Sequence, residues 1–240
     1  MVSGKGIKKI QAAGITVKVG VLKEEGSELN KRFFTFMEKN RPYIILKWAE
    51  TSDGFIARED FSSKWISDEY SRTVVHKWRS EEDAIMVGTN TVICDNPRLN
   101  VRSWNGRDPL RVFIDGKLKV SSSAFLLDRT QNTLCYNFLK SEALENLEYV
   151  KIEAGDVIHS IVDDLHSRKI QSLLVEGGAK LLNQFIQLGL WDEVRLFKSG
   201  ATFEKGIKSP EFKGDLMVRE SIVSDELFIY KPSNSFLIHN

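Results

Sequence analysis

Short apolar strands and helix-compatible segments alternate along most of this 240-residue chain, and no other feature restricts its fold as strongly. Strands are predicted at residues 43–46, 84–87, 110–114, 133–136, 149–152, 173–175 and 193–197. The helices between them are best marked at 68–79, 156–167 and 179–188, and Asp156 is placed to cap the second of these. This alternation is typical of an α/β domain. Two late segments, 217–223 and 227–230, predict an antiparallel pair that closes the sheet.

The first 40 residues have a different pattern and are predicted to form a lead-in segment. It should contain a helix at 7–10 that ends at Gly14, a short strand at 15–19, and a second helix at 24–36. The body of the domain, residues 41–240, begins at about Arg41. After its first strand, a turn at residues 52–54 is expected to send the chain back through residues 55–57.

Composition argues against several classes of protein. Lys and Arg total 34 and Asp and Glu total 33, so no net positive field favours nucleic acid, and any bound anion should be small and locally held. The two cysteines, Cys94 and Cys135, are far apart, which argues against a disulfide framework and a cysteine-rich zinc site and favours a reducing cytoplasm. The chain has neither an apolar stretch long enough to span a bilayer nor the apolar core of a signal peptide at residues 1–6. We therefore expect a cytoplasmic protein without a metal, nucleic-acid or membrane partner.

The most informative local motif is a buried strand that runs into Gly177 and Gly178 and then into a helix. Glycines let backbone N–H groups approach a phosphate, and a helix N-terminus adds partial positive charge, so the pyrophosphate of a dinucleotide is a natural ligand. A tight turn without any ligand explains the two glycines as well. Glu176 ends the strand and either faces a substrate or is a solvated carboxylate. Lys47 ends the first core strand and is either functional or a snorkelling amine.

The helix expected at 68–79 has two faces. Its predicted apolar stripe consists of Tyr70, Val74 and Trp78. Arg72, His76 and Arg79 share a different face, and two arginines on one side of a helix can converge on a phosphate because each guanidinium is a planar fork of donors. A charged helix face in water is the alternative explanation of the same pattern.

A third polar group follows the strand at 84–87. Thr91 and Asp95 stand at the C-terminal end of that strand, and Arg102 comes soon after, so this loop offers hydrogen-bonding groups and a cation. Ordinary helix capping by Thr89 or Asn90 explains part of the pattern without a ligand.

Together these residues resemble the reductase domain of the riboflavin-pathway deaminase-reductase family, which has the dihydrofolate-reductase-like fold. The similarity runs in the right order over roughly three-quarters of the chain, which makes it more specific than any one motif. Its main stretches are Arg41-Pro42-Tyr43, Lys47-Trp48-Ala49, Ser52-Asp53-Gly54, Trp65-Ile66-Ser67, Asp95-Asn96-Pro97, Asp108-Pro109-Leu110 and Val175-Glu176-Gly177-Gly178. The resemblance implies a three-layer α/β fold with a mostly parallel central sheet, and a homodimer.

The resemblance also implies an activity and a role for each matching residue. The family reduces 5-amino-6-(5-phosphoribosylamino)uracil with NADPH, and hydride goes to the ribosyl C1′ to give the ribityl product. Lys47 and Glu176 would be catalytic. Ser63, Arg79 and Arg102, here called the phosphate trio, would hold the substrate phosphate, and Leu99 would lie against the substrate. NADPH would meet Ala49, Trp65, Ser67, Thr91, Asp95, Gly177, Gly178, Ala179, Lys180, Leu181 and the rest of residues 178–184.

Residues 2–7 and 22–34 resemble the end of the family's deaminase domain. A zinc deaminase needs a His-x-Glu motif and a Pro-Cys-x-x-Cys pair, and this chain has neither, so no deaminase activity is expected of it. We expect the chain to be cut from a longer protein in which a deaminase domain is its partner, with a stand-alone reductase as the alternative.

Two other functions compete with the reductase. A same-fold reductase of another substrate, such as a pterin, is disfavoured by the phosphate trio, because a free pterin carries no phosphate. A non-catalytic dimerisation module that supports a deaminase is disfavoured by the Gly177-Gly178 pair together with Thr91 and Asp95.

Overall fold

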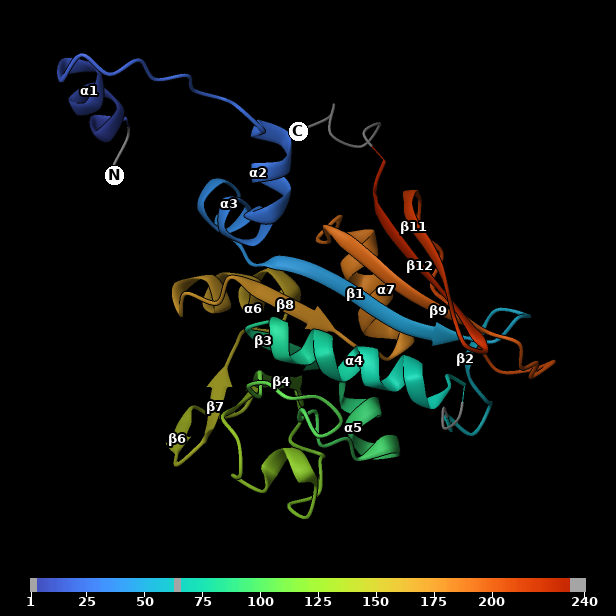
Figure 1. Cartoon of the computed structure of the whole chain (residues 1–240). Coiled ribbons are helices and arrows are strands. Elements are labelled where there is room, and N and C mark those ends of the chain that lie inside the picture. The colour runs from blue at the N-terminus through green and yellow to red at the C-terminus, as the bar shows by residue number, and fades with distance from the viewer. Residues whose placement is uncertain (1–3, 63–65, 234–240) are drawn as a thin grey trace.

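The computed structural model describes residues 4–62 and 66–233 (Figure 1). The first half contains α1 (Lys5–Ala12), α2 (Lys23–Leu29), α3 (Lys31–Glu38), β1 (Tyr43–Glu50), β2 (Phe55–Ala57), α4 (Glu69–Glu81), β3 (Ala84–Val87), α5 (Thr89–Asp95) and β4 (Leu110–Ile114). The second half contains a 3₁₀ turn (Phe125–Leu127), β5 (Thr133–Asn137), β6 (Glu142–Leu144), β7 (Leu147–Lys151), α6 (Val157–Ser167), β8 (Ser172–Val175), α7 (Ala179–Gln187), β9 (Glu193–Ser199), β10 (Ile207–Lys208), β11 (Gly214–Ile222) and β12 (Asp225–Pro232). None of the helices in these described residues is both long and apolar enough to cross a membrane.

In the described chain, ten strands form one sheet in the order β11-β12-β9-β1-β8-β3-β4-β5-β7-β6. The strands from β9 to β7 in this order run parallel, and β12, β11 and β6 add antiparallel edges. The mostly parallel sheet and its closing antiparallel pair, β11 and β12, are therefore confirmed. β2 leaves the sheet after the predicted turn and pairs with β10 in a small antiparallel ribbon.

Helices cover both faces of the sheet, which gives three layers. Successive side chains of a strand point to opposite faces, so Ile44 and Leu46 of β1 pack with α6 and α7, whereas Tyr43 and Ile45 pack with α4 and α5. The same alternation places Lys47 on the face of α4 and α5. Two apolar clusters, one on each side of the sheet, form the core.

The buried face of α4 differs from the predicted stripe. Ser71, Val75 and Trp78 are buried, while Tyr70 is 62% exposed, so the assignment of Tyr70 to the apolar face is wrong. Ser71 is buried because its hydroxyl donates a hydrogen bond of 2.7 Å to the carboxylate of Asp225 on β12. A hydrophobic pattern cannot show this polar contact, because the partner lies far along the chain.

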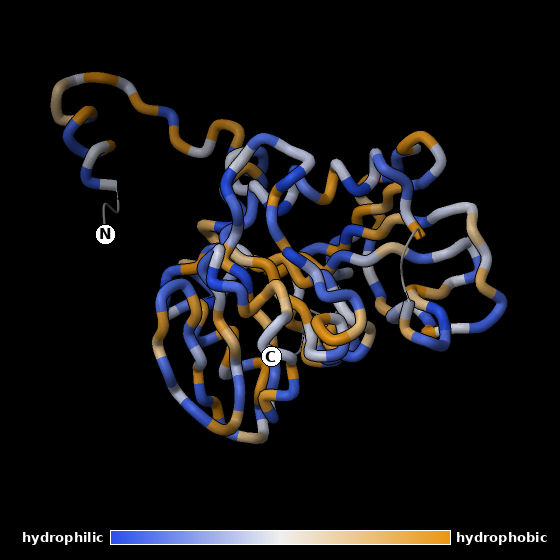
Figure 2. The backbone as a smooth tube through the Cα atoms, turned by 90° about the horizontal axis from the view of Figure 1, so that it is seen from below, coloured by the Kyte–Doolittle hydropathy of each residue, from blue (hydrophilic) through white to orange (hydrophobic). Residues whose placement is uncertain are grey.

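The lead-in segment differs from its predicted structure in two places. Residues 15–19 form no strand, because they run from α1 to α2 without a neighbouring strand. The helix expected at 24–36 is interrupted at Asn30 into α2 and α3. No residue of α1 is buried, and α1 stands apart from the body in two perpendicular views (Figures 1 and 2).

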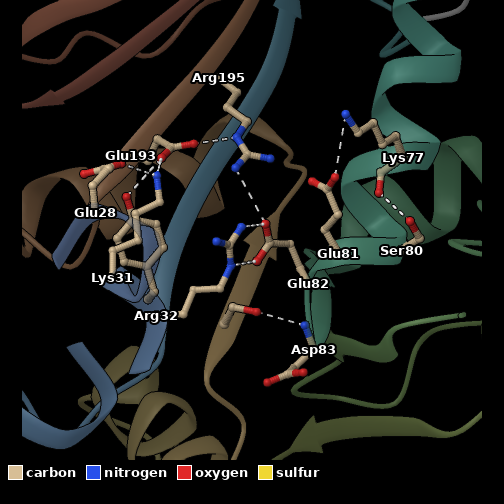
Figure 3. Close-up of polar contacts among 12 residues, drawn as sticks. Glu28, Lys31, Arg32, Lys77, Ser80, Glu81, Glu82, Asp83, Glu193 and Arg195 are labelled. Atoms are coloured by element: carbon tan, nitrogen blue, oxygen red, sulfur yellow. Dashed lines mark hydrogen bonds and ion pairs between the residues drawn. The ribbon is translucent and has the colours of Figure 1, made fainter. Parts of the chain in front are cut away.

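Buried ion pairs attach α3 to the body (Figure 3). Arg32 donates two hydrogen bonds to the carboxylate of Glu82, which is fully buried just before β3. Lys31 lies 2.8 Å from Glu193 at the start of β9, and Arg195 lies 2.6 Å from the same carboxylate. These contacts gather at the N-terminal ends of β1, β3 and β9, so α3 packs against that edge of the sheet.

Candidate active site

A cleft of about 1010 Å³ opens where β1, β8 and β3 end, at the C-terminal edge of the parallel sheet. Ligands of open α/β sheets collect at this edge, and the volume lies near the upper end of the range for small-molecule sites. Among the described residues predicted for the site, Asn183 does not line the cleft, and the others do, namely Lys47, Ala49, Ser67, Arg79, Thr91, Asp95, Leu99, Arg102, Glu176, Gly177, Gly178, Ala179, Lys180, Leu181, Leu182 and Gln184. Ser63 and Trp65 lie outside the described residues, and their roles stay predictions.

The two glycines after β8 are needed for different reasons. Gly177 has φ +115°, a conformation that side chains rarely adopt. Gly178 has φ −74°, but a Cβ there would lie 3.3 Å from Oγ1 of Thr91. Gly88, after β3, donates a backbone hydrogen bond of 2.9 Å to the carbonyl of Gly177. The ends of β8 and β3 are therefore joined, and the backbone around Gly178 is left open to the cleft.

Two helices begin beside this glycine pair. α7 starts at Ala179 and α5 at Thr89, and in the described chain no side chain caps the first turn of either helix. The hydroxyl of Thr89 instead donates to the carbonyl of Ile114 on β4, so the capping explanation of Thr89 is wrong. Uncapped helix N-termini present backbone N–H donors and partial positive charge, which favours anions. This part of the cleft can hold a phosphate or pyrophosphate group.

Glu176 and Arg79 form a bidentate ion pair inside the cleft. Arg79 donates from Nε to Oε1 over 2.8 Å and from Nη2 to Oε2 over 2.7 Å. Burial alone would raise the pKa of Glu176, but the charges of Arg79 and Lys47 lower it to about 2. The carboxylate is therefore ionised across the whole neutral range. This pair could not be predicted from sequence, because Arg79 and Glu176 are 97 residues apart in the chain.

Lys47 projects from β1 toward the same carboxylate. Its Nζ lies 5.8 Å from the centre of the Phe197 ring and makes no hydrogen bond to any described residue. Burial lowers the pKa of the Lys47 ammonium, which Glu176 counteracts and Arg79 reinforces. The result is an amine with free donors beside an ionised carboxylate.

Arginines make one end of the cleft positive. Arg102 is exposed, and its Nη1 donates to the side chain of Asn100 over 3.2 Å. Partial burial and repulsion by Arg79, Arg98 and Arg72 lower the pKa of Arg102. An anion would relieve this repulsion. The predicted role of Arg79 and Arg102 as phosphate ligands fits this field, although the fork of Arg79 is held by Glu176 here.

The structure also brings residues into the cleft that the sequence analysis missed. They include Phe61, Phe138, Val157 and Ile207, which come from a loop, the end of β5, the start of α6 and β10. Phe138 follows directly after a parallel strand, and position at a strand end was the one signal that could have identified it. The other three depend on how loops fold back over the sheet.

Comparisons with known proteins agree with this geometry. The family model described as the RibD C-terminal domain matches residues 42–201. Riboflavin biosynthesis protein RibD of Aquifex aeolicus is 39% identical over 225 residues, which cover 91% of this chain and 62% of that protein. The chain spans 62% and 55% of the length of two curated relatives that it matches.

Solved structures give the same result. A deaminase/5-amino-6-(5-phosphoribosylamino)uracil reductase from Thermotoga maritima superposes with a TM-score of 0.86 and 34% identity, covering 96% of this chain and 68% of that one. Dihydrofolate reductase from Enterococcus faecalis, solved with NADP(H), superposes with a TM-score of 0.50 and 12% identity over 80% of this chain and 97% of that one, which shows the fold alone. The predicted dihydrofolate-reductase-like fold is thus confirmed, and the chain belongs to the RibD C-terminal domain family.

Proposed function

We propose that this chain is an NADPH-dependent 5-amino-6-(5-phosphoribosylamino)uracil reductase. It reduces C1′ of the ribosyl group and gives the ribityl product. The observation that carries the proposal is one cleft that combines two uncapped helix N-termini at Gly88 and Gly178 with the Lys47–Glu176–Arg79 charge cluster. The first feature suits a dinucleotide and the second suits a polar, phosphorylated substrate.

The residues around Gly178 fit NADPH. The space that a Cβ at Gly178 would fill, 3.3 Å from Thr91 Oγ1, lets a phosphate approach the backbone closely. The first-turn N–H groups of α7 would hold the pyrophosphate, and Thr91, Asp95, Ala49 and Ser67 would line the rest of the cofactor site. When bound, the cofactor supplies the hydride, and the protein supplies position and charge.

Glu176 and Lys47 would act on the ribosyl chain. In its ring-opened form the substrate presents C1′ as an iminium carbon, which accepts hydride. The ionised carboxylate of Glu176 stabilises this positive charge, and the two hydrogen bonds from Arg79 fix the orientation of the carboxylate. The free donors of Lys47 would bind a ribosyl hydroxyl. Arg79 and Arg102 would attract the phosphate.

The test is cofactor oxidation by the purified chain. NADPH and the phosphoribosylamino-uracil are mixed with the protein, NADPH absorbance is followed, and NADH is run in parallel. We expect oxidation only when substrate and NADPH are both present. NADPH binding without turnover would point to another substrate such as a pterin, and absence of NADPH binding would favour the non-catalytic dimerisation module.

The assembly and location of the chain belong to the same proposal. We infer a homodimer that works with a deaminase domain, and light scattering on the assay sample should give the mass of two chains. A cytoplasmic location fits the two free cysteines, exposed Cys94 and buried Cys135.

A further inference from the structure

His76 lies at the arginine end of the cleft. It belongs to α4, one turn before Arg79, and its side chain is 4% exposed but lines the cleft. Its charged neighbours are Arg79 on the same helix, Arg102 in the loop after α5, and Glu176 at the end of β8. The backbone carbonyl of Asn100 also faces the ring.

One ring nitrogen of His76 has no partner. In the described chain, Nδ1 of His76 and Nη1 of Arg195 are the buried side-chain polar atoms that make no hydrogen bond. An unsatisfied buried nitrogen costs free energy, and such groups occur in native proteins mainly where they have a function. His76 lines the cleft but its Nδ1 is shielded from solvent, so a rotation of the ring is needed to bring this nitrogen to a ligand bound there.

The charges around His76 keep its ring neutral without a ligand. Burial, together with the charges of Arg79 and Arg102, lowers the pKa of His76 to about 4, and Glu176 and the Asn100 carbonyl only partly oppose this shift. A phosphate dianion held by the two arginines would reverse the sign of this local field. The ring would then gain a hydrogen-bond acceptor, and the negative charge of the phosphate would raise the pKa of the imidazolium.

We propose that His76 is a further ligand of the substrate phosphate and that it takes up one proton from solvent as the phosphate binds. The imidazolium ring then turns toward the cleft and donates from Nδ1 to a phosphate oxygen, beside Arg79 and Arg102. This role rests on the proposed function, because it requires a phosphorylated substrate in this part of the cleft. It makes phosphate affinity depend on pH: affinity rises as pH falls through the raised pKa of the bound state, and the rise ends near the free-state pKa of about 4.

The test uses D-ribose 5-phosphate as the probe and calorimetry in two buffers of different ionisation enthalpy, which counts the protons exchanged. At pH 6 the wild type should take up more protons per bound probe than His76→Gln, which has no titratable ring. The titration of the probe's own phosphate is common to both proteins and cancels in the difference. His76→Gln should bind the probe about tenfold more weakly, because a charged hydrogen bond is lost.

His159→Gln is the matched control, because His159 is an exposed histidine on α6 whose ring contacts Asp156. It should equal the wild type in affinity and proton uptake. NADPH affinity of His76→Gln should also be unchanged, which shows that the variant is folded.

A second measurement needs no variant. Imidazole ¹⁵N shifts of the wild-type protein should show one ring changing from neutral to doubly protonated on addition of D-ribose 5-phosphate at pH 6. Probe binding without this change, or equal proton uptake by His76→Gln, would overturn the role of His76 and leave the reductase proposal standing. Failure to bind the probe while NADPH still binds would do the same. Absence of both binding events would overturn the proposed function as well.

Discussion

Glu176 and Arg79 form a bidentate ion pair at the point where β8 ends beside α4. Each group is nearly buried, and neither would remain charged there at low cost without the other. The pair also leaves the carboxylate permanently ionised, since its pKa is about 2. The iminium carbon of the proposed reaction requires a negative charge, and burial without Arg79 and Lys47 would raise the pKa of the Glu176 carboxyl and weaken that charge.

Replacing Glu176 with Gln tests this charge. Gln keeps the shape and can still accept one hydrogen bond from Arg79, so the fold should persist. The turnover number should fall by about 10²- to 10³-fold, because stabilisation of the positive transition state is lost. Steady-state kinetics with NADPH and the phosphoribosylamino-uracil measure this loss, and fluorescence titration should show NADPH affinity unchanged.

Glu81→Gln is the control for Glu176→Gln. Glu81 is an exposed carboxylate on α4 whose nearest cation, Lys77, is 3.8 Å away, and its removal should leave turnover unchanged. A decrease of less than threefold for Glu176→Gln would refute the electrostatic role of Glu176.

At the scale of elements, β8, the glycine pair and α7 form the unit that builds the cofactor end of the cleft. The two positions need glycine for different reasons. Gly177 has a positive φ, whereas Gly178 has an ordinary φ but leaves little room for a Cβ beside Thr91. Substitution at each position should therefore damage a different property of the protein.

Gly177→Ala should destabilise the fold by about 1–3 kcal/mol, because alanine is strained at this φ. Gly178→Ala should unfold at nearly the same denaturant concentration as the wild type and bind NADPH about tenfold more weakly, since the new Cβ meets Thr91 in the space meant for a phosphate. Urea unfolding and NADPH titration of both variants measure the two effects.

Gly200→Ala is a suitable control, because among the described residues, apart from its two chain neighbours, none has an atom within 4 Å of a Cβ there. It should be neutral in both assays. Unchanged NADPH binding by Gly178→Ala would contradict the assignment of the phosphate site.

Elements with a strong local signal were predictable from sequence. The strands at 84–87 and 110–114 are found at those residues, and Asp156 caps α6 by accepting a hydrogen bond from the His159 amide. Contacts between distant segments were not predictable. Tyr70 was misassigned because Ser71 finds a buried partner on β12, and residues 15–19 alternate like a strand but have no sheet to join. The candidate site was located by its strand ends, whereas the Arg79–Glu176 pair required the fold.

At the scale of the whole molecule, the two ends of the parallel strands carry different groups of residues. The C-terminal edge carries the cleft, and the N-terminal edge carries the buried ion pairs that hold α3. Among these groups, Glu82 depends most on its cationic partners, because its carboxylate is fully buried. Those partners are Arg32 at hydrogen-bond distance and Arg195 at 3.6 Å.

Arg32→Met should therefore lower the free energy of unfolding by about 2–4 kcal/mol, because it leaves the Glu82 carboxylate buried with one distant cation. NADPH affinity should not change, since the cleft is at the other edge. Lys39→Met is the matched control in the same helical segment: Lys39 is half-exposed and pairs with Asp192, so its loss should cost less than about 1 kcal/mol. If urea unfolding gave equal losses of unfolding free energy for the two variants, the Arg32–Glu82 pair would stabilise the fold no more than the Lys39–Asp192 pair does.

The separation of the two edges also bears on how such a chain can evolve. A substitution in α3 or its ion pairs should change the free energy of unfolding, whereas a substitution around the cleft should change ligand binding or turnover. The two regions are separated by the length of the parallel strands. A domain attached ahead of α1 can accordingly be gained, lost or exchanged without a compensating change in the residues that line the cleft. A fold of this kind can thus serve as a portable unit, joined to different neighbours through one end of the sheet while the opposite end keeps its cleft.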